Sequence, residues 1–330
     1  MSFIRNNLRL AATLALWAAC AAPAGADDVP VPEQIVNGMN KVWGSHPGFR
    51  ANHAKGVVAE GSFVPAAGAA AFSKADLFAG KPVPVTVRFS DSTGVPTLPD
   101  GNPYANPHGM AIKFHLADGG EADLVTNSLK FFPVATGEAF RDLFAAIAAS
   151  GPDSPKPTAL DQFVASHPTV ATATASAATP SSFARETYNG VDAFVFVNAA
   201  GQRQPFRWKI VPAAGTEHLS NADAAKQAPD FLMQELPARL AKAPVVFSLS
   251  AQFANAGDPT KDPTQPWPDD RRVVELGTIT LTKAAADSAT AEKALLFLPS
   301  NLPDGIEPSD DPLIDVRTQA YAVSFGRRSQ

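Results

Sequence analysis

The 330-residue chain carries 27 Lys and Arg against 32 Asp and Glu, which gives a formal net charge of −5. This mild acidity argues against nucleic acid or an anionic membrane as a partner, because both attract basic surfaces. The length admits one large domain or two ordinary ones, and a hydrophobic content of 45% is enough for a sizeable core.

The first 26 residues have the pattern of a secretory signal. Arg5 and Arg9 precede an apolar run that ends at Cys20, and small residues stand before Asp27. Because the run is too short to span a bilayer, we expect cleavage after Ala26 and a periplasmic or secreted protein. A retained membrane anchor and a lipid-modified Cys20 are the alternatives.

Cleavage would leave 25 basic against 32 acidic residues, a formal charge of −7, and would remove the single cysteine. The mature chain would then have no disulfide and no thiolate metal site. No later stretch reaches the length of a membrane span. There is no internal repeat and no clear linker, so we expect one domain, Asp27–Gln330.

An N-terminal helix is expected over Glu33–Val42, since Ile35, Met39 and Val42 fall on one side of it. Eight runs of strand-forming residues follow, mostly bounded by Gly, Pro, Asn or Asp. Eight strands with few helices between them favour a closed antiparallel barrel, an α+β fold, over a doubly wound sheet. The expected strands are Gly56–Phe63, Val83–Ser90, Gly109–Leu116, Ala122–Phe132, Ala193–Asn198, Gln204–Val211, Pro244–Phe253 and Val273–Leu281.

Further helices are expected over Gly137–Ala149, over Ala222–Lys242 and at the end of the chain. The segment 145–180 is rich in Ala, Ser, Thr and Pro, so we expect it to follow the surface around a short helix at Ala159–His167. Asn198–Gln202 has the composition of a hairpin turn.

The expected C-terminal helix carries the most specific pair of side chains. Arg317 and Tyr321 are four residues apart, so a helix places the guanidinium beside the phenol. A neighbouring cation favours the phenolate, which is an uncommon ligand of haem iron. The alternative is an ordinary amphipathic helix with an Arg–Tyr contact.

Three upstream segments carry further polar side chains. His53 stands just before a strand with Arg50 three residues earlier, and Arg88 and Ser90 share one face of the next strand. Asn127 is followed closely by two phenylalanines. An isolated histidine is more often structural than functional, so each segment by itself is a weak signal.

Together, and in this order, these segments resemble the haem catalases. Phe297–Asp311 is similar to the segment that leads into the family's proximal helix, and Tyr188–Gly201 is similar to its central hairpin. The resemblance covers about Val42–Tyr321 and implies a catalase-like eight-stranded barrel with surrounding helices that binds haem b. Full catalases continue into a C-terminal helical domain, whereas this chain stops nine residues after Tyr321. It therefore most resembles the small catalase-related peroxidases.

The resemblance implies a role for each candidate residue. His53 and Asn127 would be the distal catalytic pair, with Ser90 hydrogen-bonded to the histidine. Tyr321 would be the axial iron ligand. The residues implied to bind the cofactor or to support its ligand are Arg317 as charge partner, Asp311 behind it, Arg50 and Arg88 at the haem propionates, and Phe132 or Phe140 against the porphyrin. One departure is Asn106-Pro107-His108-Gly109, where the family has Asp-Pro-Arg-Gly, which puts one cationic contact near the haem edge in doubt.

The implied activity is a haem peroxidase that reduces hydrogen peroxide or organic hydroperoxides with a small organic electron donor, with weak catalase activity. A hydroperoxide isomerase or dehydratase acting on lipid hydroperoxides is one alternative, and a non-catalytic haem carrier of the cell envelope is another. Trp43, Trp208 and Trp267 are either packing residues or electron relays to a surface donor. The sequence leaves open whether the protein is a monomer or a dimer.

Overall fold

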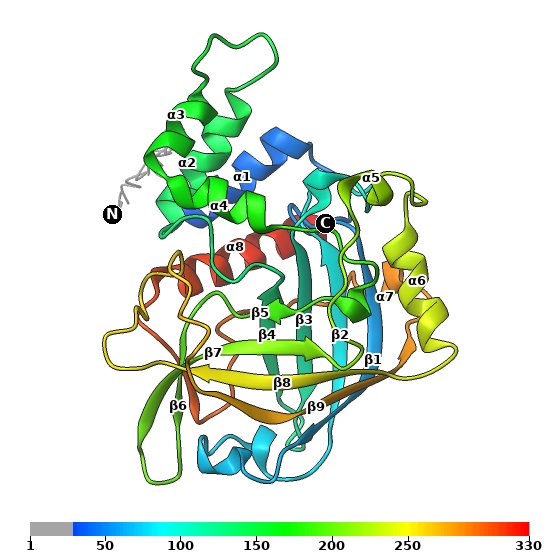
Figure 1. The fold of residues 1–330 in the computed structure, drawn as a ribbon, viewed down its shortest axis with the longest axis vertical. Helices are drawn as coiled ribbons and strands as arrows, with labels where there is room; N and C mark the ends of the chain where they lie inside the picture. The colour runs from blue at the N-terminus through cyan, green and yellow to red at the C-terminus, as the bar shows by residue number, and fades with distance from the viewer. Residues whose placement is uncertain (1–28, 330) are drawn as a thin grey trace, which may run out of the picture. The chain divides into compact units, whose positions relative to one another are not determined.

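A closed antiparallel β-barrel forms the centre of the fold (Figure 1). The computed structural model describes residues 29–329. Within them, eight strands pair in the circular order β1, β2, β3, β4, β5, β7, β8, β9 and back to β1, every pair antiparallel. The bounds are β1 (Gly56–Pro65), β2 (Val83–Asp91), β3 (His108–His115), β4 (Glu121–Asn127), β5 (Tyr188–Asn189), β7 (Arg203–Pro212), β8 (Val245–Phe253) and β9 (Val273–Ala284).

Alternation along β2 shows how the barrel positions the site. Val85, Val87 and Phe89 belong to the main apolar core, in which aromatic and branched side chains pack. Arg88 and Ser90 point to the opposite face by the two-residue period of a strand, yet both are only 4% exposed. The segment before β1 covers this face, where His53 contacts both side chains, and Glu292 pairs with Arg88.

Three helices, α1 (Val31–Trp43), α2 (Gly137–Ala148) and α8 (Pro312–Arg328), pack against one another. Ile35, Met39 and Phe144 form a second apolar cluster between α1 and α2, with Val316 of α8 packed against it. Figure 1 shows α8 running between the strands and the group of helices that includes α3 (Ala159–Ser166) and α4 (Pro168–Ser176). The remaining helices are α5 (Asn221–Ala224), α6 (Phe231–Leu240), α7 (Ser288–Ala291) and the short 3₁₀ turns Ala69–Ala71, Asp76–Phe78, Pro103–Ala105 and Phe183–Arg185.

The predicted eight-stranded barrel is confirmed, but one of its members is different. The expected strand Ala193–Asn198 corresponds to β6 (Phe194–Val197), which lies outside the ring and pairs with β7 and with β10 (Ile306–Pro308). The ring is completed instead by the two-residue β5, which joins β4 to β7. A pairing this short has no alternation of its own, so hydrophobic periodicity could not predict it.

Two other predicted elements differ from the structure: an expected helix is interrupted, and an expected strand is shorter. The helix expected over Ala222–Lys242 is two helices, α5 and α6, separated by a segment that contains Pro229. Proline lacks an amide hydrogen and disfavours helical backbone in the residue before it, which accounts for the break. The strand expected to reach Phe132 ends at Asn127, and the helix expected at Ala159–His167 is confirmed as α3. The unpredicted α4 follows α3 almost directly.

The expected signal, Met1–Ala26, lies outside the described residues. Among residues 29–329, none of the helices combines the length and the apolar character needed to cross a membrane.

Candidate functional site

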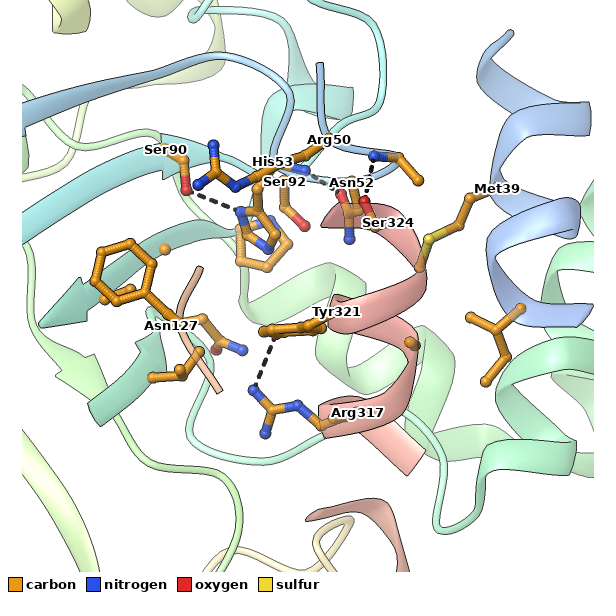
Figure 2. Close-up of a pocket in the computed structure, with 18 of the residues that line it drawn as sticks. Met39, Arg50, Asn52, His53, Ser90, Ser92, Asn127, Arg317, Tyr321 and Ser324 are labelled. Atoms are coloured by element: carbon orange, nitrogen blue, oxygen red, sulfur yellow. Dashed lines mark hydrogen bonds between the residues drawn. The ribbon is translucent and has the colours of Figure 1, made fainter. Parts of the chain in front are cut away.

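A cavity of about 350 Å³ lies between the barrel and helices α1, α2 and α8. It brings together side chains that are far apart in the sequence and that come from α1, from the segment before β1, from β2 and β4, and from α8 (Figure 2). Residues of α2 also line this cavity. Its lining includes every predicted site residue except Asp311: His53, Ser90, Asn127, Arg50, Arg88, Phe132, Phe140, Arg317 and Tyr321.

His53 is held in an unusual backbone conformation. Its φ is 56°, which is rare for a residue other than glycine, and its amide donates to Oδ1 of Asn52 at 2.8 Å. Nδ1 of the ring lies 3.0 Å from Oγ of Ser90. Gly109 faces both groups, and a Cβ there would lie 3.0 Å from the His53 ring and from Ser90 Oγ. The glycine is therefore needed for the close approach of the His53–Ser90 pair.

The surroundings of His53 keep its imidazole neutral. Burial lowers its pKa most, and the positive charges of Arg88, Arg50 and Arg317 lower it further, to about 3. A charged imidazole would lose hydration in a place that already holds several cations. At neutral pH, His53 can therefore accept a proton.

Asn127 stands at the end of β4 with a fixed amide. Its Oδ1 accepts a hydrogen bond from the amide of Leu129 at 2.7 Å. Nδ2 is the donor that remains on this side chain. Figure 2 shows this nitrogen pointing to the side of the cavity where Tyr321 lies.

On α8, the predicted Arg317–Tyr321 pair is present. The guanidinium of Arg317 donates to the Tyr321 hydroxyl at 3.3 Å and forms an ion pair with Asp192, which is 2% exposed. Although burial opposes it, Asp192 and Tyr321 together raise the pKa of Arg317. In Figure 2, Arg317 lies on one side of the Tyr321 ring, and His53 and Ser90 lie on the other. Asp192 was not predicted as a site residue, since nothing in its spacing along the sequence marks it.

Asp311 does not line the cavity. It is the N-cap of α8, and its Oδ1 accepts from the amide of Leu313 at 2.9 Å, which satisfies one of the free amides at the start of the helix. Burial and the neighbouring Asp192 raise the pKa of Asp311 to about 7, although Arg317 acts in the opposite direction. The charge of Arg317 therefore affects the pKa of Asp311, but the carboxylate that forms an ion pair with the guanidinium is that of Asp192.

A cluster of cations closes another part of the wall. Arg50, Arg88 and Arg328 all line the cavity, and the carboxylate of Glu292 pairs with Arg50 at 3.2 Å and with Arg88. Arg88 also donates to the carbonyl of His53 at 2.8 Å. Burial, followed by the neighbouring arginines, lowers the pKa of Arg50 to about 8, and burial followed by Arg88 lowers that of Arg328 to about 10. One carboxylate among three guanidinium groups leaves an excess of positive charge that suits further carboxylates.

Arg328 and Glu292 were not predicted as site residues from the sequence. Arg328 lies seven residues after Tyr321, which is two helical turns, so its position on the same face of α8 was a usable signal. Glu292 follows the short helix α7 and carries no comparable signal.

The aromatic candidates Phe132 and Phe140 lie together on the cavity wall, with ring centroids 5.0 Å apart. His108, the departure noted in the sequence, does not line the cavity. It is fully buried, with Nδ1 3.2 Å from Asp91. The arginines that do line the cavity are Arg50, Arg88, Arg317 and Arg328.

The fold and the cavity define a β-barrel protein with a largely apolar site. A phenol and an imidazole lie on its walls, and its arginines suit a ligand that carries carboxylates. Residues 47–328 match the family model described as Catalase. The chain belongs to the catalase family.

Individual relatives agree with this assignment. The chain is 33% identical to a catalase-related peroxidase of Synechococcus elongatus, over 91% of this chain and 89% of the relative, and 35% identical to one of Mycolicibacterium paratuberculosis, over 90% and 95%. A catalase of Pseudomonas syringae is 31% identical over 83% of this chain but only 56% of its own length. A fungal catalase structure superposes with a TM-score of 0.76 at 20% identity, over 96% of this chain and 66% of that one.

Proposed function

We propose that this protein is a haem-dependent peroxidase that reduces hydrogen peroxide or organic hydroperoxides with a small organic electron donor. Membership of the catalase family and likeness to two catalase-related peroxidases over about 90% of the chain support the proposal. The observation that carries it is the placement of a neutral His53 and the Arg317–Tyr321 pair in the wall of one cavity.

The residues present fit haem b. The phenol oxygen of Tyr321 would hold the iron, and Arg317 donates a hydrogen bond to this oxygen at 3.3 Å. Arg50, Arg88 and Arg328 would bind the two propionates, which supply the carboxylates that their cluster lacks. Phe132 and Phe140 provide an apolar wall. When bound, haem supplies the iron that reduces peroxide and then takes electrons from the donor.

The protein's own part in the reaction is proton transfer and orientation. With Nδ1 of His53 held by Ser90, Nε2 is the ring nitrogen left to take the proton from one peroxide oxygen. His53 then returns this proton to the other oxygen, so that the leaving oxygen departs as water or as an alcohol. Nδ2 of Asn127 donates a hydrogen bond to the peroxide as charge develops on it.

The assignment of Tyr321 as the residue that would hold the iron is tested by Tyr321→Phe. This change keeps the ring and removes the oxygen, so we expect it to lose most bound haem or to change the absorption spectrum of what remains. Tyr104 is an exposed tyrosine outside the cavity, and its backbone amide donates to the side chain of Asn102. Tyr104→Phe is therefore the matched control. Unchanged haem content and spectrum in Tyr321→Phe would reject Tyr321 as the ligand.

The reaction itself is tested by giving the haem-loaded protein hydrogen peroxide or an alkyl hydroperoxide with a phenolic donor. We expect donor oxidation to exceed peroxide disproportionation and the organic peroxide to yield its alcohol. Rapid disproportionation without oxidation of any donor would favour a catalase, and a rearranged product from a lipid hydroperoxide would favour an isomerase or dehydratase.

We further propose that the mature protein begins after Ala26 and acts in the periplasm or outside the cell, because Met1–Ala26 has the signal pattern described above. N-terminal sequencing of protein recovered from the periplasm tests this, and an intact Met1 in the cytoplasmic fraction would contradict it.

A further inference from the structure

Two polar side chains in the wall of the cavity, Asn52 and Ser92, take no part in the proton transfer proposed for this site. The backbone segments that carry them are hydrogen-bonded to each other, with the amide of Ala54 donating to the carbonyl of Thr93 at 2.8 Å. The same two segments carry the catalytic histidine and its serine partner. A second polar pair therefore lies close to the first.

The amide of Asn52 is oriented by the backbone next to it. Its Oδ1 accepts a hydrogen bond from the amide of His53 at 2.8 Å, so Nδ2 is the donor that remains on this side chain. Figure 2 shows this nitrogen extending into the cavity from the side of the Tyr321 ring on which His53 lies. The oxygen of Asn52 thus supports the backbone of His53, and its nitrogen is directed at the space that a ligand would occupy.

Ser92 brings a hydroxyl to the same part of the cavity. Ser90 and Ser92 both line the cavity, but the hydroxyl of Ser90 is engaged with Nδ1 of His53 at 3.0 Å. In Figure 2, Ser92 lies on the same side of the Tyr321 ring as Asn52 and His53. Because a hydroxyl both donates and accepts, Ser92 complements the amide donor of Asn52.

The wall next to these two side chains is apolar. Gly94, two residues after Ser92, packs against Ala51 and Trp43, since a Cβ there would lie 2.5 Å from the carbonyl oxygen of Ala51 and 2.7 Å from the indole. Ala51, Trp43 and Met39, which precedes Trp43 by one turn of α1, all line the cavity. A polar pair beside an apolar wall fits a small aromatic molecule that carries one hydroxyl group.

We propose that Asn52 and Ser92 form a subsite for the hydroxyl group of the electron donor, and that this donor is a phenol. The inference rests on the peroxidase function proposed above and names the class of its donor. Nδ2 of Asn52 donates to the phenol oxygen, the hydroxyl of Ser92 forms a second hydrogen bond, and the aromatic ring packs on the apolar wall.

The chemistry of the donor agrees with a position near His53. Each phenol gives up one electron and one proton and becomes a phenoxyl radical, and peroxide is the oxidant. Neutral His53 is the base that can accept the proton. Two phenols therefore supply the two electrons and two protons that convert one hydrogen peroxide into two waters.

The first test measures binding without turnover. Phenol and toluene, which has a methyl group in place of the hydroxyl, are titrated into the haem-loaded protein without peroxide, and both Kd values are taken from the change in absorbance. Ser92→Ala should lower the ratio of phenol affinity to toluene affinity by about 2–10-fold, the net contribution of one hydrogen bond between neutral groups. Ser92→Thr, which keeps the hydroxyl, should retain the ratio. Ser176→Ala, at an exposed serine of α4 outside the cavity lining, is the matched control.

The second test measures the steady-state oxidation of phenol by hydrogen peroxide. Ser92→Ala should lower kcat/KM for phenol by about 2–10-fold and leave kcat/KM for hydrogen peroxide unchanged, because the two substrates react in separate steps. Asn52→Ala should lower both values, since it removes the donor to phenol and also the acceptor for the His53 amide.

The outcomes separate this inference from the function on which it rests. An unchanged affinity ratio in Ser92→Ala, or an equal fall in kcat/KM for phenol and for hydrogen peroxide, overturns the subsite and leaves the peroxidase function in place. Loss of haem from Ser92→Ala also overturns it, because the serine would then hold the cofactor and not the donor. Wild-type protein that binds phenol more tightly than Ser92→Ala but never oxidises it with peroxide overturns the proposed function instead.

Discussion

The imidazole of His53 is neutral first because it is buried and second because three arginines surround it, and both effects lower its pKa. Arg88, Arg50 and Arg317 come from three separate parts of the chain, yet all three act on the same ring. The arginines at the cavity wall therefore have two effects, since they attract carboxylates and also keep the nearby imidazole free of a proton.

Replacing His53 by Gln should remove proton transfer and leave the cavity intact. Because general acid–base catalysis contributes about 10²–10⁴-fold, we expect the rate of reaction with peroxide to fall by that order, with haem content unchanged. Stopped-flow absorbance after mixing with peroxide measures this rate. Ser90→Ala, which removes the hydrogen bond to Nδ1 and keeps the base, should cost less than His53→Gln; an equal loss would show that orientation rather than proton transfer dominates.

The pKa of about 3 for His53, against 6.5 for the free side chain, also predicts a pH dependence of stability. Between these two values the unfolded chain binds a proton that the folded protein does not. The contribution of His53 is therefore fully present above pH 6.5 and is lost as the pH falls toward 3. Urea unfolding of the wild type and His53→Gln should show the wild type losing stability relative to the variant across this window. A constant difference between the two would contradict the depressed pKa.

Single residues were predictable where a motif or a helical spacing marked them. Arg317 and Tyr321 follow from an interval of four residues, and the strand period placed Arg88 and Ser90 on one face. Asp192 and Glu292 were not predictable in this way, because each meets its arginine across more than a hundred residues of chain. Only the closed barrel and the helices packed on it bring these charges together.

At the level of elements, α8 sets the spacing of the site. One helix carries Arg317, Tyr321 and Arg328, at intervals of four and seven residues. A change in where this helix begins therefore alters the positions of all three side chains. Asp311 fixes that beginning as the N-cap.

Two substitutions at Asp311 separate its cap from its charge. Asp311→Ala removes the acceptor for the Leu313 amide and should cost about 0.5–2 kcal/mol of unfolding free energy. Asp311→Asn keeps an acceptor and removes a carboxyl whose pKa is raised from 3.8 to about 7. The stability that this raised pKa provides is present below pH 3.8 and lost as the pH rises through 7, so the Asn variant should gain on the wild type between pH 4 and pH 8. Denaturant unfolding at several pH values measures both effects, and an Asn variant that loses ground as the pH rises would contradict the raised pKa.

The elements predicted best were those with a long periodic pattern. Seven of the expected strands belong to the barrel, because each buries one face in the core and so alternates along its length. The β5 pairing at Tyr188 has only two residues, and its place in the ring is set by the neighbours β4 and β7. The break between α5 and α6 has a local cause in Pro229 and could have been predicted. No local feature of the sequence indicates that β6 lies outside the barrel.

At the scale of the whole molecule, the cavity lies where the barrel and the helices α1, α2 and α8 meet, so a ligand in it contacts both. The walls are largely apolar, with Leu143, Phe144 and Leu313 among them, and the cationic cluster supplies the charge. A group that fills this space adds packing between barrel and helices that neither part can make alone. Binding and folding are therefore expected to be coupled.

Haem loading should raise the free energy of unfolding by an amount set by mass action. With free haem about 100-fold above its Kd, the gain should be about 2.7 kcal/mol, since the folded cavity does not exist in the unfolded chain. Guanidinium unfolding of the haem-free and loaded proteins measures it, with loss of the haem absorption band and of helical circular dichroism expected in one transition. Arg328→Gln should weaken haem binding and reduce the gain, whereas Lys130→Gln, which removes a charge that is 62% exposed and pairs with Asp269 outside the cavity, should leave it unchanged. Loss of haem well before the helices unfold would show that the ligand does not join barrel and helices, and would count against the coupling.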